Sequence, residues 1–395
     1  MKSRTRPCGG NDCASTDGKG NTDFAVCDTE VLCPSIDSGK LLLVGGYMEG
    51  NSGQKVPSEI VDIRDGKTCT SPSFMTDYKD GTYSALLYNK YAIVMGGDAI
   101  KEEIHVFKDD GTILDVEVEG EGKSRKYAAA VTLADKKSMY VVGGYYSAEG
   151  EITDSTEIIH MNSEGTEATG KSGPKIPKKL VNHCFTAFTM NNERYFFLFG
   201  GSQTVSLPSS DQASGFSQNG WVLKESDMDV DDSTSWNKAT ETPTTNVPTN
   251  MVYITCATFK TADNKEHIMI VGDEDLMTMT KTLIYKPETN EFTSGPGFKI
   301  EQDGLDVYGW FWASMHASTL VANEVVITGG QGYIMEADFD PFITVDYSKY
   351  KFKLQCANGV TDTSACTFEI MDSELQYGRR QHVTFNVPDA WVTCN

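Results

Sequence analysis

The sequence lacks the features that would place the chain in a membrane or on nucleic acid. It contains no run of about 18 apolar residues, so no segment is long enough to span a bilayer. Basic residues near the start are not followed by an apolar stretch, so no signal peptide is visible. Acidic residues outnumber basic ones by 56 to 34, whereas binding a phosphate backbone requires clustered Lys and Arg. We therefore expect neither membrane insertion nor nucleic-acid binding.

Motifs that would identify an enzyme are also missing. The 6 histidines are scattered singly, without the His-x-Glu or His-Glu-x-x-His spacing of metal sites. No Gly-x-Ser-x-Gly sequence marks a nucleophilic serine. The expectation is a protein without enzymatic activity and without a cofactor. A sugar enzyme of the mutarotase or hydrolase type needs only a few residues on one surface, so it stays open as an alternative.

Cysteine, in contrast, is abundant, and the 10 cysteines indicate disulfides. Four of them crowd into residues 1–39, a Gly-, Asp- and Thr-rich stretch with too few apolar residues to build a core. Such a segment orders only when cross-linked, which requires an oxidising compartment, and the spacings fit zinc poorly. We therefore expect a secreted protein with a cysteine-rich N-terminal extension, although the absence of any Asn-x-Ser/Thr sequence weakens that expectation. The cysteines of the extension are Cys8, Cys13, Cys27 and Cys33.

The remaining cysteines allow three further interpretations. Cys356 and Cys366 flank a hairpin-like loop that a disulfide would clamp. Cys394 follows the last predicted strand, so a bond to an N-terminal cysteine would fasten the two ends of the chain. Cys184 and Cys256 each lie sixteen residues before a glycine that ends an apolar run, and a disulfide between them or two buried thiols are both open.

The dominant pattern is a repeat of short apolar runs that end in Gly-Gly or a close variant. Their spacing is near 50 residues, and continuous apolar runs of this length indicate strands buried on both faces. The glycines allow backbone angles at the strand end that a side chain would forbid. The glycine positions are 45–46, 96–97, 143–144, 200–201, 272–273 (Gly-Asp) and 329–330.

Further strands flank each apolar run. A strand with small or aromatic residues precedes the run, as at 127–131 or 183–188. An alternating strand follows it, as at 103–107 or 342–346, and a turn then leads to a fourth strand. Each repeat therefore predicts four antiparallel strands.

These repeats resemble those of the kelch family of β-propellers, over residues from about 40 to 387. The segment Ile284-Tyr285-Lys286-Pro287-Glu288-Thr289-Asn290-Glu291-Phe292 is very similar to the strand–turn–strand sequence of that family. The Trp that the family places at the start of the outer strand appears only as Trp236. The resemblance implies an all-β, six-bladed kelch-type propeller spanning residues 40–395, in which each repeat is one blade.

The two ends of the repeat region predict how such a ring closes. The segment 379–385 resembles an innermost strand, but no Gly-Gly run follows it. The first Gly-Gly run, at 41–46, has no convincing strand before it. Pairing the C-terminal strand with the N-terminal blade would complete that blade and remove free sheet edges. If residues 30–36 formed an inner strand instead, an irregular seventh blade would result.

An aromatic cluster beside two carboxylates is the first candidate binding site. It lies where the chain crosses from one blade to the next, and in kelch propellers such crossings line one face of the ring. Aromatic faces next to carboxylates suit sugar rings or cationic side chains of a partner. Packing between blades is the alternative role for these aromatic residues. The cluster comprises Asp303, Asp306, Tyr308, Trp310 and Trp312.

Basic residues at equivalent crossings form a second candidate set. They stand out in an acidic chain and could bind a carboxylate or sulfate, or they could pair with neighbouring acids. The set comprises Arg125, Lys126, His183, Arg379 and Arg380. Asp227, Asp229 and Asp231 alternate as in calcium loops, but the required glycine is replaced by Asp232, which leaves only a weak calcium candidate.

Together these features predict an extracellular binding or scaffold protein that recognises a protein or a glycan through one face. A carbohydrate-active enzyme is the first alternative. A structural component of an extracellular matrix or assembly is the second.

Overall fold

The described part of the molecule is a single unit built of strands. The chain divides into two compact units, Met1–Asp37 and Ser38–Asn395, and every described residue belongs to the second. No helix among the described residues has the length and apolar character to cross a membrane. The computed structural model describes residues 39–387 except for 49–55, 77–80, 89, 98–102, 109–111, 121–122, 147–148, 205–216, 249–250, 262, 274–279, 303–304, 308–316, 322–323, 331, 335–342, 346–350, 357–365, 372–373 and 381.

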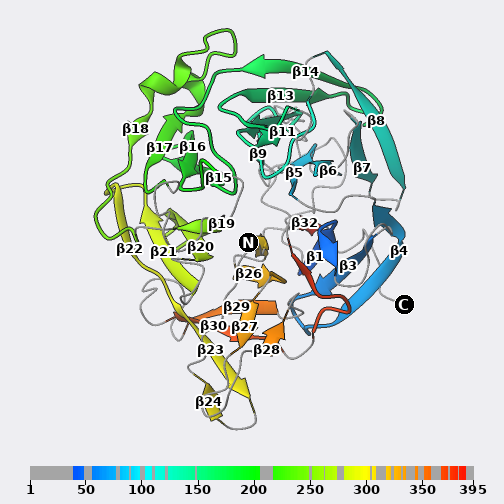
Figure 1. The fold of residues 1–395 in the computed structure, drawn as a ribbon, viewed down its shortest axis with the longest axis vertical. Helices are drawn as coiled ribbons and strands as arrows, with labels where there is room; N and C mark the ends of the chain where they lie inside the picture. The colour runs from blue at the N-terminus through cyan, green and yellow to red at the C-terminus, as the bar shows by residue number, and fades with distance from the viewer. Residues whose placement is uncertain are drawn as a thin grey trace, which may run out of the picture. The chain divides into compact units, whose positions relative to one another are not determined.

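The fold is all-β, as predicted, and its recurring unit is an antiparallel sheet of four strands (Figure 1). In each sheet the hydrogen-bonded strands follow one another from a first strand at one edge, through a second and a third, to an outer strand. The sheets are β32 (Val383–Val387), β1 (Lys40–Val44), β3 (Val56–Asp62) and β4 (Thr68–Thr76); β5 (Thr82–Leu87), β6 (Tyr91–Gly96), β7 (Glu103–Lys108) and β8 (Ile113–Gly120); β9 (Ala129–Thr132), β10 (Ser138–Val142), β13 (Thr156–Met161) and β14 (Ala168–Gly173); β15 (Cys184–Met190), β16 (Glu193–Phe199), β17 (Gly220–Lys224) and β18 (Thr240–Glu241); β19 (Val252–Lys260), β20 (Glu266–Asp273), β21 (Thr280–Lys286) and β22 (Glu291–Ser294); β25 (Ala317–Val321), β26 (Glu324–Thr328), β29 (Lys351–Cys356) and β30 (Cys366–Ile370).

Smaller elements connect or extend these sheets. The outer strands β8 and β14 pair in parallel, which joins two four-stranded sheets into one of eight. A further strand pairs in parallel with β30 and extends that sheet in the same way. The smaller elements are β2 (Tyr47–Met48) with β31 (Arg379–Arg380), β11 (Tyr145–Tyr146) with β12 (Glu151–Ile152), β23 (Gly297–Gln302) with β24 (Leu305–Val307), β27 (Gly332–Ile334) with β28 (Ile343–Val345), and the 3-10 turns η2 (Glu225–Asp227) and η3 (Ser235–Lys238).

The predicted glycine-tipped runs are the second strands of the sheets. All residues of β6 and β10 are buried, as expected for strands covered on both faces. The glycines after these runs adopt left-handed backbone angles, for example φ 60° at Gly143 and 99° at Gly144.

The cores lie between neighbouring sheets. Each of the six core clusters in the described part of the chain combines residues of two sheets. The first strands also contact one another in series: β5 with β9, β9 with β15, β15 with β19, β19 with β25, β25 with β32, and β32 with β5. Side chains that alternate along a strand therefore enter two different cores.

The predicted pairing of the C-terminal and N-terminal strands is confirmed. β32 pairs antiparallel with β1, so that Phe385 lies opposite Leu42. Both residues belong to one core cluster, which also contains Val94 and Phe107 of the next sheet. The C-terminal strand β32 is therefore the first strand of the sheet whose other strands, β1, β3 and β4, come from the N-terminal part of the repeat region.

One predicted strand is assigned differently in the structure. The third strand of the last sheet is β29, which pairs with β26, and not residues 342–346. Residues 343–345 form β28, which pairs with β27 in a small hairpin inserted between the second and third strands. The short apolar run of β28 was therefore mistaken for the sheet strand, whereas β29 carries Lys351 and Lys353 in its sequence.

Removing the last strand tests the importance of this pairing. Deletion of residues 383–387 should expose the edge of β1 and the apolar side chains of Leu42 and Val44. We expect a loss of the single cooperative unfolding transition, measured by circular dichroism during urea denaturation. A deletion of the same length at 205–209, outside the described residues, is the control. A truncated protein that unfolds cooperatively at the same urea concentration would contradict the role assigned to β32.

Candidate functional site

The segments that enter the first strands share a backbone geometry. Tyr127, Asn182 and Tyr253 have left-handed φ angles of 57°, 53° and 47°, and Gly81 has a φ of 70° at the matching place. The amide of Tyr127 donates to the carbonyl of Gly81 (3.0 Å), and the amide of Asn182 donates to the carbonyl of Tyr127 (3.1 Å). Backbone hydrogen bonds therefore connect successive entry segments.

These entry segments surround a cavity of about 210 Å³. Residues at the starts of β5, β9, β15, β19 and β32 form its wall. Half-buried polar residues on this wall include Ser84, Asn182, Thr255 and Thr384, and Tyr127 and Tyr253 add aromatic rings. None of the described lining residues is Asp, Glu, Lys or Arg. In a chain whose residues are 23% charged, the cavity is therefore uncharged over its described wall.

Arg125 does not face this cavity. Its side chain is fully buried and pairs with Glu157 of β13. The guanidinium also donates to the carbonyls of Gly143 (2.8 Å) and Ser155 (3.0 Å). Burial raises the pKa of Glu157, and the charge of Arg125 opposes that rise. The arginine therefore ties the entry segment to the second and third strands of its own sheet.

Arg379 repeats this arrangement in the sheet that β32 completes. It is buried, pairs with Glu59 of β3, and donates to the carbonyls of Gly45 (3.3 Å) and Pro57 (2.9 Å). Burial lowers the pKa of the Arg379 guanidinium, and Glu59 counteracts this effect. The sequence left two roles open for these residues, and the structure shows Arg125 and Arg379 buried and paired with acids.

Replacing Arg379 by Met should destabilise the protein by about 3–5 kcal/mol, because Glu59 would remain buried without its partner. The double variant Arg379→Met with Glu59→Leu should recover part of that loss, since no charge is then stranded. Arg64→Met is the matched control, because the Arg64 side chain is 53% exposed, and it should shift stability by roughly 0.5 kcal/mol or less. Urea unfolding measures all three. An Arg379→Met protein as stable as the control would refute the role of the buried pair.

Two histidines, His183 and His382, stand just before first strands, and their rings pack between neighbouring sheets. A Cβ on Gly143 would lie 2.8 Å from Cε1 of His183, and a Cβ on Gly329 would lie 2.7 Å from Cε1 of His382. Each imidazole thus packs against the first glycine of the preceding sheet. Nε2 of His382 hydrogen-bonds to the hydroxyl of Thr328 (2.8 Å), the residue before Gly329.

His183 has a less polar environment than His382, because Val142 occupies the place of Thr328. Within the described part of the chain neither of its ring nitrogens makes a hydrogen bond of ordinary geometry, and the backbone of Val142 favours protonation less than burial opposes it. Burial lowers the pKa of His183 to about 4. His183 borders the cavity, and its ring packs against Gly143 of the neighbouring sheet.

This pKa predicts a specific pH dependence of stability. An unfolded histidine takes up a proton near pH 6.5 and the folded His183 only near pH 4, so the unfolded state gains protons as the pH falls between these values. Stability should therefore decrease from pH 6.5 towards pH 4, by roughly 3 kcal/mol from this residue. Urea unfolding of His183→Gln should show a shallower decrease than the parent protein. The exposed His160→Gln is the control, and identical slopes for all three proteins would contradict the assignment.

Of the other predicted binding residues, some lie outside the described residues and the rest lie in short strands or bridges. Asp303, Tyr308, Trp310 and Trp312 lie outside the described residues. Asp306 belongs to β24, where its register partner is Glu301. Lys126 forms a backbone bridge to Tyr145, and Arg380 pairs with Tyr47 in the β2–β31 ladder.

The proposed calcium residues lie in a segment with several local hydrogen bonds. The Asp229 carboxylate accepts the amide of Asp231 (3.0 Å), and the Asp232 carboxylate accepts the amide of Thr234 (2.9 Å). The backbone carbonyl of Asp227 accepts a hydrogen bond from Lys238 (3.3 Å). Across the described ranges, no three His, Cys, Asp or Glu side chains come together as metal ligands. Of the three alternating aspartates, Asp229 thus caps a turn amide with its carboxylate, and the calcium site stays a prediction.

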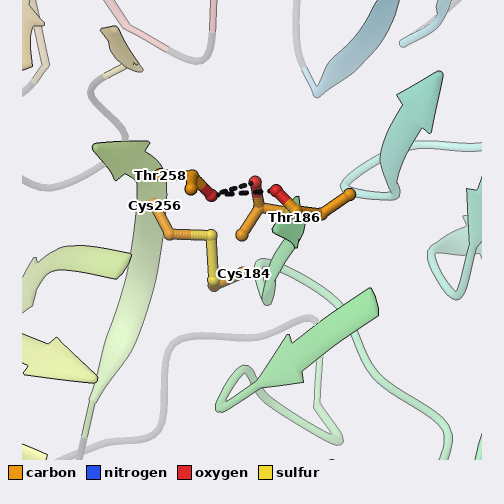
Figure 2. Close-up of a disulfide and its surroundings, with 5 residues drawn as sticks. Cys184, Thr186, Cys256 and Thr258 are labelled. Atoms are coloured by element: carbon orange, nitrogen blue, oxygen red, sulfur yellow. Dashed lines mark hydrogen bonds between the residues drawn. A yellow bond between two sulfur atoms is a disulfide. The ribbon is translucent and has the colours of Figure 1, made fainter. Parts of the chain in front are cut away.

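Cys184 and Cys256 form a disulfide with a Cα–Cα distance of 5.6 Å, which resolves the alternative left open by the sequence (Figure 2). The two positions are not equivalent. Cys184 lies opposite Phe199, one residue before Gly200, whereas Cys256 lies opposite Ile270, two residues before Gly272. A shift of one residue reverses the face of a strand to which a side chain points. The shift follows a register irregularity between Val252 and Thr255, and it allows the two sulfurs to face each other.

Other cysteines add to this picture. Cys366 is in a disulfide, and its register partner across the β29–β30 hairpin is Cys356. Cys69 of β4 is also in a disulfide, which the sequence pattern does not indicate because Cys69 stands alone in its repeat. Cys8, Cys13, Cys27, Cys33 and Cys394 lie outside the described residues.

Comparison with known proteins gives only distant likenesses. No protein-family model matches the chain, and no curated protein matches it. A fungal alcohol oxidase of the AA5 family, solved in complex with copper, is 12% identical, with a TM-score of 0.47 and 89% of each chain covered. A structure of YjhT is also 12% identical, with a TM-score of 0.47, covering 77% of this chain and 86% of the other. Likenesses this remote carry no argument about binding or catalysis.

Proposed function

We propose that the described unit is a six-bladed, kelch-type β-propeller that acts as an extracellular binding protein. The series of contacts between first strands supports six blades, because it passes through six strands and returns to β5. The eight-stranded sheet then counts as two blades joined at their outer strands. The core clusters support the same count, since each lies between two blades that follow each other in the series.

In such a ring the cavity lies on the axis, and we propose it as the binding site for an uncharged polar group of a glycan. The observation that carries this proposal is the uncharged character of the described wall. Hydroxyl and amide groups, as on Ser84, Asn182 and Thr255, can exchange hydrogen bonds with sugar hydroxyls. The rings of Tyr127 and Tyr253 offer faces against which a sugar ring can pack.

The size of the cavity supports recognition of one ring rather than a long chain. A volume of about 210 Å³ is smaller than the roughly 300–1,000 Å³ of pockets that enclose drug-sized ligands. A terminal sugar residue would enter the cavity, and the rest of a glycan would continue over the surrounding loops. Long loops on a rigid scaffold are where binding residues concentrate.

Binding without turnover is favoured by the chemistry of the same wall. Hydrolysis of a glycosidic bond uses a pair of carboxyl groups on either side of the bond. The described lining residues include no carboxylate, and the imidazole of His183 is held between sheets. An oxidising compartment is supported by the disulfide between Cys184 and Cys256, because bonds of this kind persist outside the reducing cytosol.

A glycan array probed with the labelled protein tests this function. We expect binding to neutral glycans with a common terminal residue, and no preference for sulfated or sialylated ones. Ser84→Phe should abolish this binding, because Ser84 lines the cavity and a phenyl ring needs far more room than a hydroxymethyl group, and the protein should keep its melting temperature within a few degrees. Ser163→Phe, the same change at an exposed turn, should bind like the parent protein.

Two results would count against the proposal. Retention of only anionic glycans would show that an uncharged wall is not the recognition surface. Release of a free sugar from a bound glycan would favour the enzymatic alternative.

A further inference from the structure

The disulfide between Cys184 and Cys256 differs from a clamp within a hairpin, because it joins two neighbouring sheets. Cys184 belongs to β15 and Cys256 to β19, which are first strands in contact. Both cysteines line the cavity. The bond is therefore part of the cavity wall, and it fixes the separation of two of the strands that form the wall.

The two cysteine residues differ in exposure. Cys184 is 1% exposed and lies in the core between the sheets, packed among Phe197 and Phe199. Cys256 is half-buried at the edge of the same core and borders the cavity. A thiolate that approaches through the cavity therefore reaches Cys256 first, and Cys184 becomes the leaving group.

A second link holds the strands together after the bond is broken. Two residues further along each strand, the hydroxyls of Thr186 and Thr258 lie 3.2 Å apart, and Thr258 donates to the carbonyl of Ala187 (3.0 Å) (Figure 2). The apolar core between the sheets also remains, with Ile270 and Leu283 fully or almost fully buried. Cleavage of the disulfide should thus loosen the cavity end of the two strands without separating the sheets.

We propose that this disulfide is a redox-sensitive lock on the axial cavity. A dithiol attacks Sγ of Cys256, a mixed disulfide forms, and Cys184 leaves as a thiolate that takes up a proton. The second thiol of the reductant then displaces Cys256, so the protein gains two thiols and the dithiol becomes a cyclic disulfide. Two unbonded sulfurs need more room than two bonded ones, so the wall opens between β15 and β19.

The lock concerns the site of the proposed function, but it is tested without a glycan. The first measurement is the rate at which dithiothreitol reduces the Cys184–Cys256 bond in the folded full-length protein, followed by alkylation and mass spectrometry. We expect reduction at least about tenfold faster than global unfolding, because the cavity gives access to Cys256. Reduction that proceeds only as fast as unfolding would overturn the proposal.

Filling the cavity provides the matched test. Ser84 lies on β5, which β9 separates from β15 in the series of first strands, so Ser84→Phe adds bulk to the cavity wall on a strand that does not carry the disulfide. It should slow reduction by about tenfold, since access controls the rate of thiol exchange. Ser163→Phe should leave the rate unchanged, and the Cys366 disulfide in the same samples provides an internal reference. Thr384→Phe on β32 serves as a second filling variant if Ser84→Phe does not fold.

Hydrogen exchange after reduction measures the structural consequence. We expect faster exchange at the cavity ends of β15 and β19 and unchanged exchange in β16 and β20. Faster exchange throughout the domain would contradict the proposal, because the bond would then stabilise the whole fold and not the cavity wall alone. Unchanged exchange in β15 and β19 would also contradict it, because the bond would then not control the wall. A failed glycan screen together with these expected rates would remove the proposed ligand and leave the lock in place.

Discussion

The close approach of neighbouring first strands is the constraint on which the rest of the structure depends. These strands have one edge towards the cavity and send alternate side chains into two different cores. A shift of one strand therefore changes the packing against both neighbouring sheets. Phe185 enters the core with Phe196, while the adjacent Cys184 enters the core on the other side. Glycine is required where the next entry segment passes the end of β10, because a Cβ on Gly143 would meet the carbonyl of Leu180 at 2.7 Å. The buried arginines then fix the entry segments to their own sheets, which leaves the cavity wall free of their charge.

Much of the fold could be predicted from the sequence because second strands are buried on both faces. Continuous apolar runs such as Ala92–Met95 are typical of strands covered on both faces, and the glycines after them mark the strand ends. Pairing of the last strand with the first sheet followed from an inner strand without a successor and an apolar run without a predecessor. The third strand of the last sheet was missed because Lys351, despite its charge, is buried and donates to the carbonyl of Gly66 (2.8 Å). A sequence pattern cannot show that a lysine has a partner 285 positions away.

The candidate site was less predictable, since its chemistry depends on which way side chains point. Arg125 and Arg379 stood out as basic residues in an acidic chain, but their acidic partners are in the third strands and cannot be paired by sequence distance. The disulfide between Cys184 and Cys256 depends on a register irregularity after Val252, which no spacing rule reveals. The uncharged wall was overlooked because small residues such as Ser84 and Ala130 attract no attention singly. Their significance arises only when five strands bring them to one cavity.

The strands β15 and β19 are adjacent parts of the wall of one cavity and are joined through their cysteines. Proteolysis of the native, non-reduced protein followed by mass spectrometry of the linked peptides measures this link. We expect a peptide containing Cys184 bonded to a peptide containing Cys256, in a form that separates on reduction. Recovery of Cys184 as a free thiol, or bonded to any cysteine other than Cys256, would contradict the arrangement of the wall.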